Sequence, residues 1–344
     1  MNKRHSSKRM SSRTLHGFTL VELMIAMVLG LLVVGATIGV FLSNQQTYRI
    51  NEGLSQIQES ARTSFEILGR ELRQAAGNAC GDSTRVANVL NNAGSDEWAT
   101  WAGIRAYEGD EATGMAPFGT DPGDRVQGTH AVHIQGTDGL GVGLADRQSA
   151  AQSANLFLNL PTDEFEAGDI LMVCDPNQAT IFQVTNYQQQ NTTVVANSGA
   201  GNPGNCSTGQ GYPTVCQNPG TPYIYDTNAT VAYFKSVTWY IGHNGRDDEG
   251  GFSLYRARVN QGNVVREEVV AGVSDMTIRA HRSGMDGWDN PSALNATAWE
   301  QVDALELTLS FLSAADRITT NPNQDDGRLS RDVTHVIALR NRLP

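Results

Sequence analysis

The feature that most constrains this chain is a run of 25 residues, 18–42, with the sequence FTLVELMIAMVLGLLVVGATIGVFL. Its only ionisable side chain is Glu22. As an α-helix the run would be about 37 Å long, which is enough to cross a hydrocarbon core of about 30 Å. Residues 1–17 carry five Lys or Arg and no Asp or Glu, and the next basic residue is Arg49. We therefore predict one membrane span, with the N-terminus in the cytoplasm and everything after residue 42 outside.

An ordinary cleaved signal peptide describes this run poorly. Such a peptide has an apolar core of about 7–15 residues, followed by a cleavage site of small residues. Here the core is longer, no clean Ala-x-Ala site follows it, and the helical pattern continues into polar sequence. The simple alternative that remains is an uncleaved signal anchor.

Glu22 argues against a simple anchor. A carboxylate inside a membrane helix costs about 2.5–3.5 kcal/mol on insertion scales, so it needs a cationic partner and is a candidate functional residue. No basic side chain lies within the run. Cleavage between Gly17 and Phe18 would create an α-amine four residues before Glu22, one helical turn away. The pair could form within one chain, or between Glu22 of one subunit and the Phe18 amine of its neighbour.

The sequence G-FTLVE, between a basic leader and an apolar run, resembles the class III signal of type IV prepilins and type II secretion pseudopilins. Gly17, Phe18 and Glu22 stand at the matching positions. The resemblance implies that a prepilin peptidase removes residues 1–17 as a leader peptide. It also implies that the new amine of Phe18 is methylated.

The helical pattern continues beyond the span. Between residues 43 and 76 the apolar residues are spaced by three or four positions, which predicts an amphipathic helix. These residues are Ile50, Leu54, Ile57, Ala61, Phe65, Leu68, Leu72 and Ala75. Gly77 and Asn78 are expected to end a helix that runs from residue 18 to about 76. Gly35 and Gly39 indicate either a close-packing face in the span or simply the frequency of Gly in membrane helices.

Residues 77–344 are predicted to form a β-rich globular domain, and the whole chain an α+β fold. Antiparallel sheet is expected to pack on the second half of the long helix. The predicted strands are His130–Gln135, Asn155–Leu160, Asp169–Cys174, Thr180–Asn186, Thr192–Ala196, Thr230–Ile241, Phe252–Val259, Val264–Val270, Met276–His281, Val302–Leu312 and Asp332–Arg340. Residues 82–128 and 197–228 are rich in Gly, Asn, Ser, Thr and Pro, and are expected to be irregular.

The chain has four cysteines. The predicted topology places all of them outside the cytoplasm, where disulfides form, and four cysteines allow three pairings. Cys206 and Cys216 flank a turn-rich stretch, so a local bridge is our first choice, and Cys80 would then pair with Cys174. A zinc site is disfavoured because no C-x-x-C motif is present.

Net charge and the absence of known motifs disfavour several classes of ligand and activity. The net charge is −11, and −16 without residues 1–17, which disfavours a nucleic-acid partner. Metal ligation by His130 and His133 is disfavoured because a spacing of three points them to opposite faces of a strand. The acidic stretch Asp247-Asp248-Glu249 is interpreted as a solvated turn and not as a calcium site. The sequence has no catalytic motif, so we predict neither an enzyme nor a cofactor.

A second acidic stretch imitates a calcium-binding loop. It contains Asn321, Asn323, Asp325 and Asp332, but Gly327 falls at the seventh position where such loops require the sixth. Two of its potential ligands are neutral Asn side chains. A calcium site is therefore disfavoured here as well.

Two further segments resemble minor pilins of the PilW type. They are the stretch from Gln58-Glu59-x-x-Arg62 through LGRELR (68–73) to Cys80, and the C-terminal sequence VIALRNR (336–342). Residues 269–281 (VVAGVSDMTIRAH) and 299–309 are similar both to PilW-type pilins and to type II secretion pseudopilins of the J type. The resemblance is strong over residues 13–81, weaker over 265–344 and absent between them.

The resemblance implies a type IV pilin-like fold and a place in a complex of minor pilins that primes pilus assembly, with the pilus tip as one position for it. As partners it implies other minor pilins, the major pilin, a prepilin peptidase and the bacterial inner membrane, with the globular domain in the periplasm and the subunit incorporated into a pilus. A type II secretion pseudopilin is the alternative. A membrane-anchored periplasmic enzyme or binding domain, using the unmatched middle of the chain, is another.

Overall fold

The computed structural model describes residues 17–77, 79–81, 85–91, 93–145, 154–227, 229–319 and 325–342. These residues form two units, one up to Glu52 and one from Gly53 onward. Helix α1 (Leu20–Arg73) begins in the first unit and ends in the second. Most of the predicted leader, and Asn78, Asn321 and Asn323, lie outside the described residues.

Helix α1 is shorter than the predicted 18–76 at its C-terminal end. Gln74–Ala76 form a turn, and Ala76 has a positive φ of 61°. The backbone N–H of Ala76 donates to the carbonyl of Gln135 (2.7 Å) instead of to a helical carbonyl. The helix does not continue through Ala76 because the backbone N–H of this residue is bonded to the sheet.

The second unit contains an eight-stranded sheet with the order β1-β6-β5-β9-β10-β11, in which β3 also pairs with β9, and β2 with β3. The bounds are β1 Val86–Asn88, β2 Ile104–Tyr107, β3 Ala131–Gly143, β5 Ile170–Cys174, β6 Ala179–Gln183, β9 Thr230–His243, β10 Phe252–Asn260 and β11 Asn263–Ala271. All pairs are antiparallel except β1 with β6.

Two three-stranded antiparallel sheets complete the unit. One has the order β12-β13-β14, with bounds Val273–Arg282, Val302–Leu312 and Ser330–Ala338. The other has the order β4-β8-β7, with bounds Asn155–Phe157, Thr193–Val195 and Asn186–Gln188. The short helices are α2 Ala296–Glu300, η2 Gln189–Asn191, η3 Asp247–Glu249, η4 Pro291–Ala293, η5 Asp325–Gly327 and η6 Arg340–Arg342.

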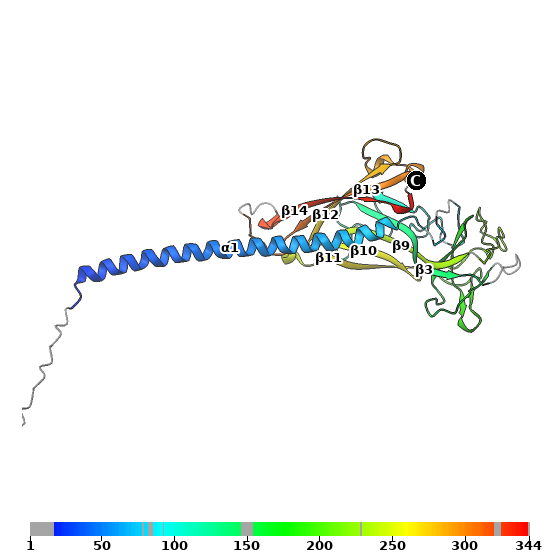
Figure 1. Cartoon of the computed structure of the whole chain (residues 1–344), viewed down its shortest axis with the longest axis horizontal. Helices are drawn as coiled ribbons and strands as arrows, with labels where there is room; N and C mark the ends of the chain where they lie inside the picture. The colour runs from blue at the N-terminus through cyan, green and yellow to red at the C-terminus, as the bar shows by residue number, and fades with distance from the viewer. Residues whose placement is uncertain are drawn as a thin grey trace, which may run out of the picture. The chain divides into compact units, whose positions relative to one another are not determined.

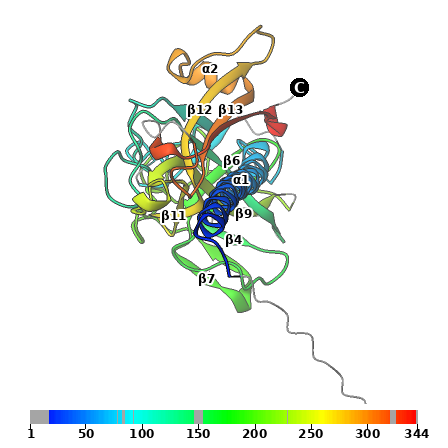
Figure 2. The ribbon, with the colours of Figure 1, turned by 90° about the vertical axis from the view of Figure 1, so that its left-hand side faces the viewer.

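The part of α1 from Gly53 onward packs against both the eight-stranded sheet and the β12–β14 sheet (Figures 1 and 2). Its buried stripe has the predicted helical spacing, and joins residues of both sheets in the largest core cluster. Members of that cluster from α1 are Ile57, Ala61, Phe65, Leu68 and Leu72. A long apolar N-terminal helix followed by a β-rich domain is thus confirmed.

Each predicted strand run contains a strand, but three strands were missed. β1 and β2 lie within residues 82–128, which were predicted to be irregular, and most of β7 lies between two predicted strands. These strands have only three or four residues each, too few to show a periodicity. The parallel pairing of β1 with β6 also corrects the expectation of a purely antiparallel sheet.

A buried carboxylate holds α1 to the sheet. Glu71 is 6% exposed and accepts a hydrogen bond from the indole N–H of Trp239 (2.8 Å). It also forms ion pairs with Lys235 (3.1 Å) and Arg256 (3.2 Å). Trp239 and Lys235 lie on β9, and Arg256 on β10. Because buried charges are stable only when they are paired, Glu71 fixes how the helix sits on these two strands.

The C-terminal residues close the end of α1. The side-chain amide N–H of Asn341 donates to the carbonyls of Gln74 (3.1 Å) and Ala75 (3.3 Å). These carbonyls belong to the turn that follows Arg73, the last residue of α1. A Cβ added to Gly77 would lie only 2.1 Å from the Asn341 amide nitrogen, so glycine makes room for this cap.

Candidate functional site

The N-terminal site predicted from the sequence lies at the start of α1, in the first unit. Thr19 caps the helix: its Oγ1 accepts a hydrogen bond from the backbone N–H of Glu22 (3.3 Å), and its carbonyl accepts one from Leu23 (3.1 Å). Thr19 and Glu22 thus occupy the N-cap and N3 positions of a capping-box sequence. Gly17 and Phe18 precede the helix, and Phe18 is 84% exposed.

Glu22 lies in the first turn of α1, where the positive end of the helix dipole favours a carboxylate. That gain, about 0.3–1 kcal/mol, is smaller than the membrane cost of about 2.5–3.5 kcal/mol. The only Lys or Arg in residues 18–52 is Arg49, about 40 Å farther along the helix. Residues 18–52 thus offer no basic side chain near Glu22, whereas an amine created at Phe18 would lie one helical turn away.

The helix around this acid is apolar on every side. Each large apolar side chain from Leu20 to Leu42 is more than half exposed. Among the described residues, α1 is the one helix long and apolar enough to cross a membrane.

The N-terminal sequence also has a recognised pattern. Residues 13–38 match the family model of the prokaryotic N-terminal methylation motif. This motif is the class III signal peptide of type IV pilin-like proteins, and the match supports membership of the pilin superfamily. Together with the apolar helix it fits a membrane-anchored protein with a globular domain. No curated protein and no solved structure matches the chain.

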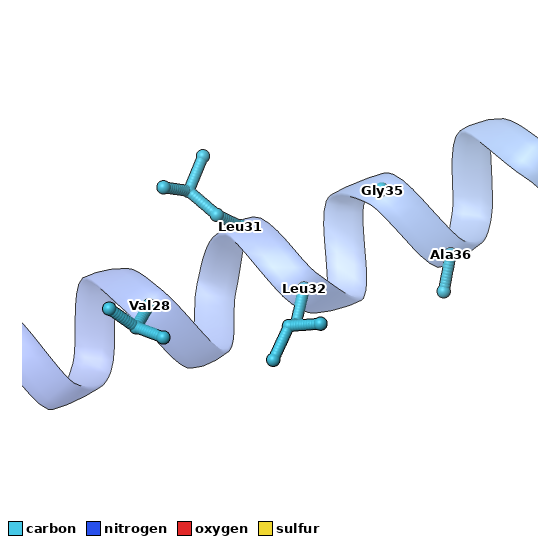
Figure 3. Close-up of a pocket in the computed structure, with 5 residues that line it drawn as sticks. All are labelled: Val28, Leu31, Leu32, Gly35 and Ala36. Atoms are coloured by element: carbon cyan, nitrogen blue, oxygen red, sulfur yellow. The ribbon is translucent and has the colours of Figure 1, made fainter.

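The residues matched by the methylation motif include a shallow groove on the apolar helix. The groove is lined by Val28, Leu31, Leu32, Gly35 and Ala36. Val28, Leu32 and Ala36 project to the same side of the helix, and Gly35 leaves the backbone uncovered (Figure 3). A Cβ at Gly35 would meet no atom within 4 Å, so no contact inside the described chain requires glycine there.

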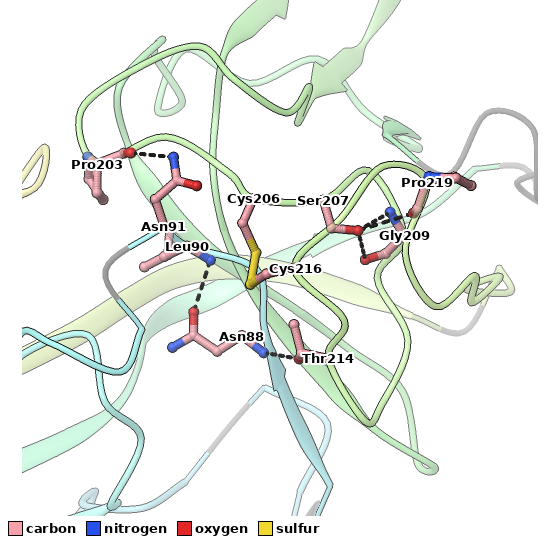
Figure 4. The surroundings of a disulfide bond; sticks show 10 residues. All are labelled: Asn88, Leu90, Asn91, Pro203, Cys206, Ser207, Gly209, Thr214, Cys216 and Pro219. Atoms are coloured by element: carbon pink, nitrogen blue, oxygen red, sulfur yellow. Dashed lines mark hydrogen bonds between the residues drawn. A yellow bond between two sulfur atoms is a disulfide. The ribbon is translucent and has the colours of Figure 1, made fainter.

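The four cysteines form two disulfides, Cys80–Cys174 and Cys206–Cys216, which is the pairing favoured from the sequence. The first joins the segment after α1 to the end of β5. The second lies in the long connection before β9 (Figure 4). Beside it, the backbone N–H of Asn88 donates to Thr214 Oγ1 (2.9 Å), which ties this connection to β1.

His130 and His133 each have contacts of their own. The Nδ1 atom of His130 accepts a hydrogen bond from the backbone N–H of Ile278 (3.1 Å), which ties the start of β3 to β12. His133 is 1% exposed and its ring nitrogens face Thr238 (2.8 Å) and Ser236 (3.4 Å). Burial lowers the pKa of His133 to about 4, so its ring is neutral near pH 7.

The two acidic stretches considered for calcium line one cleft. Asp247 of the first lies there with Asp325 and Asp326 of the second, together with the buried Arg328. The guanidinium of Arg328 donates to the carbonyl of Asp248 (2.7 Å), so a cation already fills part of this space. In the part of the chain that the structure describes, no group of three His, Cys, Asp or Glu could hold a metal ion.

Sequence reasoning missed the roles of Glu71 and Asn341. A signal for Glu71 was present, because it stands beside Leu72 on the apolar stripe of an amphipathic helix, where a charge needs a buried partner. The sequence offered no comparable signal for Asn341, which acts on carbonyls more than 260 positions earlier in the chain.

Proposed function

We propose that this chain is a minor pilin of the PilW type that acts in the assembly of type IV pili. A prepilin peptidase would cut between Gly17 and Phe18, and the new amine of Phe18 would be methylated. The mature subunit would remain in the inner membrane, with its globular domain in the periplasm, until it joins other minor pilins and the major pilin in a growing pilus.

The observation that carries the proposal is the single acid in the first turn of an apolar helix, within a methylation motif. The only Lys or Arg in residues 18–52 is Arg49, about 40 Å along the helix from Glu22, and cleavage before Phe18 would supply an amine one turn away. Paired with the amine of a neighbouring subunit, Glu22 would favour a defined register between helices. Oppositely charged groups attract strongly where water is excluded.

Mass spectrometry of the mature N-terminus tests the processing step. We expect a chain that begins with methylated Phe18. An intact Met1, or a cut beyond residue 42, would contradict the proposal.

Substitution of Glu22 tests the charge pair. We expect Glu22→Ala to be cleaved normally but to enter pili poorly, because its helix has lost the partner of the Phe18 amine. Glu52→Ala, an exposed acid on the same helix outside the apolar run, is the matched control. Normal pilus number and normal co-purification of partner pilins with Glu22→Ala would refute the charge-pair mechanism.

A type II secretion pseudopilin is the second candidate, because residues 269–281 and 299–309 are similar to J-type pseudopilins as well as to PilW-type pilins. Both candidates use the same processing and the same helix, so the N-terminus does not separate them. Deletion of the gene does: loss of twitching motility indicates a pilus subunit, and loss of protein secretion indicates a pseudopilin.

A further inference from the structure

Residues 176–225 contain no Asp, Glu, Lys, Arg or His. In a chain with 18% charged residues, a stretch of this length would carry about nine, and typical domains carry more. The stretch instead has seven Asn, seven Gln, seven Thr and four Tyr. We call it the charge-free segment, and such a composition in an otherwise acidic chain calls for a physical reason.

The charge-free segment includes β6, β7, β8 and most of the connection to β9. Within the second unit it lies beyond the C-terminal end of α1, together with the green strands and loops in Figure 1. It therefore occupies the end of this unit that is farthest from Gly53.

The connection in this segment is held in one conformation although it has little regular structure. The disulfide Cys206–Cys216 closes a short loop, and Ser207 Oγ donates to the carbonyl of Pro219 (3.0 Å) (Figure 4). Thr221 Oγ1 donates to the carbonyl of Pro213 (2.8 Å). A loop fixed before binding loses little conformational entropy when a ligand arrives.

The fixed loop presents an exposed aromatic residue whose backbone is bonded next to an exposed amide. Tyr212 is 53% exposed, and its backbone N–H donates to the side-chain carbonyl of Gln178 (3.2 Å). Asn177, the residue before Gln178, is exposed, and a hydrogen bond joins its side chain to Tyr223. We call Asn177, Tyr212 and Tyr223 the tyrosine–amide patch.

One charged residue, Asp175, contacts the patch directly. Asp175, just outside the segment, is 6% exposed. Its carboxylate accepts hydrogen bonds from the backbone N–H groups of Asn177 (2.8 Å) and Gln178 (3.0 Å), and from the hydroxyl of Tyr223 (2.7 Å). The carboxylate oxygens of Asp175 thus position Asn177 and Tyr223 within the patch.

From these observations we infer that the tyrosine–amide patch binds a neutral polysaccharide. Sugar hydroxyls are uncharged donors and acceptors, and uncharged groups such as the Tyr212 phenol and the Asn177 side-chain carbonyl suit them chemically. The exposed ring of Tyr212 can cover an apolar sugar face. A nucleic acid would require basic residues, and a protein partner would favour a more apolar centre with Arg, neither of which the segment provides.

Binding to polysaccharide beads tests this inference, which does not depend on pilus assembly. The full chain in detergent is applied to cellulose, dextran and mannan beads, with heparin beads as the charged control and albumin-coated beads as the protein control. We expect retention on at least one neutral polysaccharide, unchanged by 0.5 M NaCl because no ion pair is involved.

Variants then locate the contact. Tyr212→Ala keeps the backbone N–H that bonds to Gln178, so it should fold, and we expect it to bind about tenfold more weakly, the size of one aromatic contact. Tyr212→Trp should retain binding, and Met285→Ala, which alters a half-exposed side chain elsewhere, should bind like the unaltered chain.

Several results would overturn the inference. They are retention on none of the neutral polysaccharides, retention that Tyr212→Ala leaves unchanged, and salt-sensitive retention on heparin alone. Equal retention on albumin that Tyr212→Ala weakens would also overturn it, and would identify a protein-binding surface instead.

Discussion

Replacement of Glu71 by Ala should loosen α1 from the domain. The substitution removes the acceptor of the Trp239 indole and a counter-charge of both Lys235 and Arg256. Removing one member of a buried ion pair costs about 3–5 kcal/mol. Arg256 keeps Glu267 as a partner (2.7 Å), and the Lys235 side chain is 18% exposed, so we expect the lower end, about 3 kcal/mol.

The Gln variant separates charge from hydrogen bonding. Glu71→Gln keeps an acceptor for Trp239 but removes the negative charge, so its loss of stability should lie between that of the unaltered chain and that of Glu71→Ala. Glu66→Ala, at an exposed position on the same helix, is the matched control and should change stability by at most about 0.5 kcal/mol.

Urea unfolding of the full chain in detergent, followed by tryptophan fluorescence with the disulfides intact, measures these differences. The midpoint should fall in the order unaltered chain, Glu71→Gln, Glu71→Ala, with an unchanged slope. If Glu71→Ala unfolds at the same urea concentration as Glu66→Ala, the ion pairs do not fasten the helix and the reasoning is wrong.

Two further predictions concern pH and the cap of α1. Because the pKa of His133 is about 4 in the folded chain and about 6.5 in the unfolded chain, unfolding takes up a proton between these values. The free energy of unfolding should therefore fall by up to about 3 kcal/mol as the pH is lowered from 6.5 to 4. In His133→Gln, the urea midpoint should fall less over the same pH range. Gly77→Ala should displace the Asn341 amide and lower the free energy of unfolding by about 1–2 kcal/mol. In an Asn341→Ala background the same substitution should lower it by much less. Equal losses in both backgrounds would disprove the coupling between the two residues.

The parts of the fold that repeat over a long stretch could be predicted from the sequence. The spacing of Ile57, Ala61, Phe65, Leu68 and Leu72 defined the buried stripe of α1, because apolar residues at steps of three and four over many turns fall on one face only in a helix. The strands with strong alternation were located in the same way.

Prediction failed where distant backbone decides the structure. Residues 136–143 of β3 are rich in Gly and were not predicted as strand, yet residues 136–138 and 142–143 pair with β9, on either side of an irregularity at 139–141. A Cβ at Gly141 would lie 2.8 Å from the carbonyl of Val231, so glycine here admits a neighbouring strand and does not mark a turn. The close approach of the two strands depends on residues some 90 positions away in the sequence. A local sequence pattern therefore does not predict it.

At the candidate site, the motif located Gly17, Phe18 and Glu22 but not the cap. Thr19 was missed because its hydroxyl matters only once the helix start is known. The contacts of Glu71 could not be predicted either, because they depend on the fold that brings Trp239, Lys235 and Arg256 together from β9 and β10.

The ion pair of Lys235 has a consequence for chemical labelling. Lys3, Lys8 and Lys235 are the three lysines of the chain, and the first two lie in the proposed leader. Once the leader is gone, the Phe18 terminus and a single ε-amine are the nucleophilic nitrogens that an acylating reagent could modify, and that ε-amine is held against Glu71. A dye coupled to amines at neutral pH would therefore mark the membrane end of the mature subunit and leave its globular surface unlabelled.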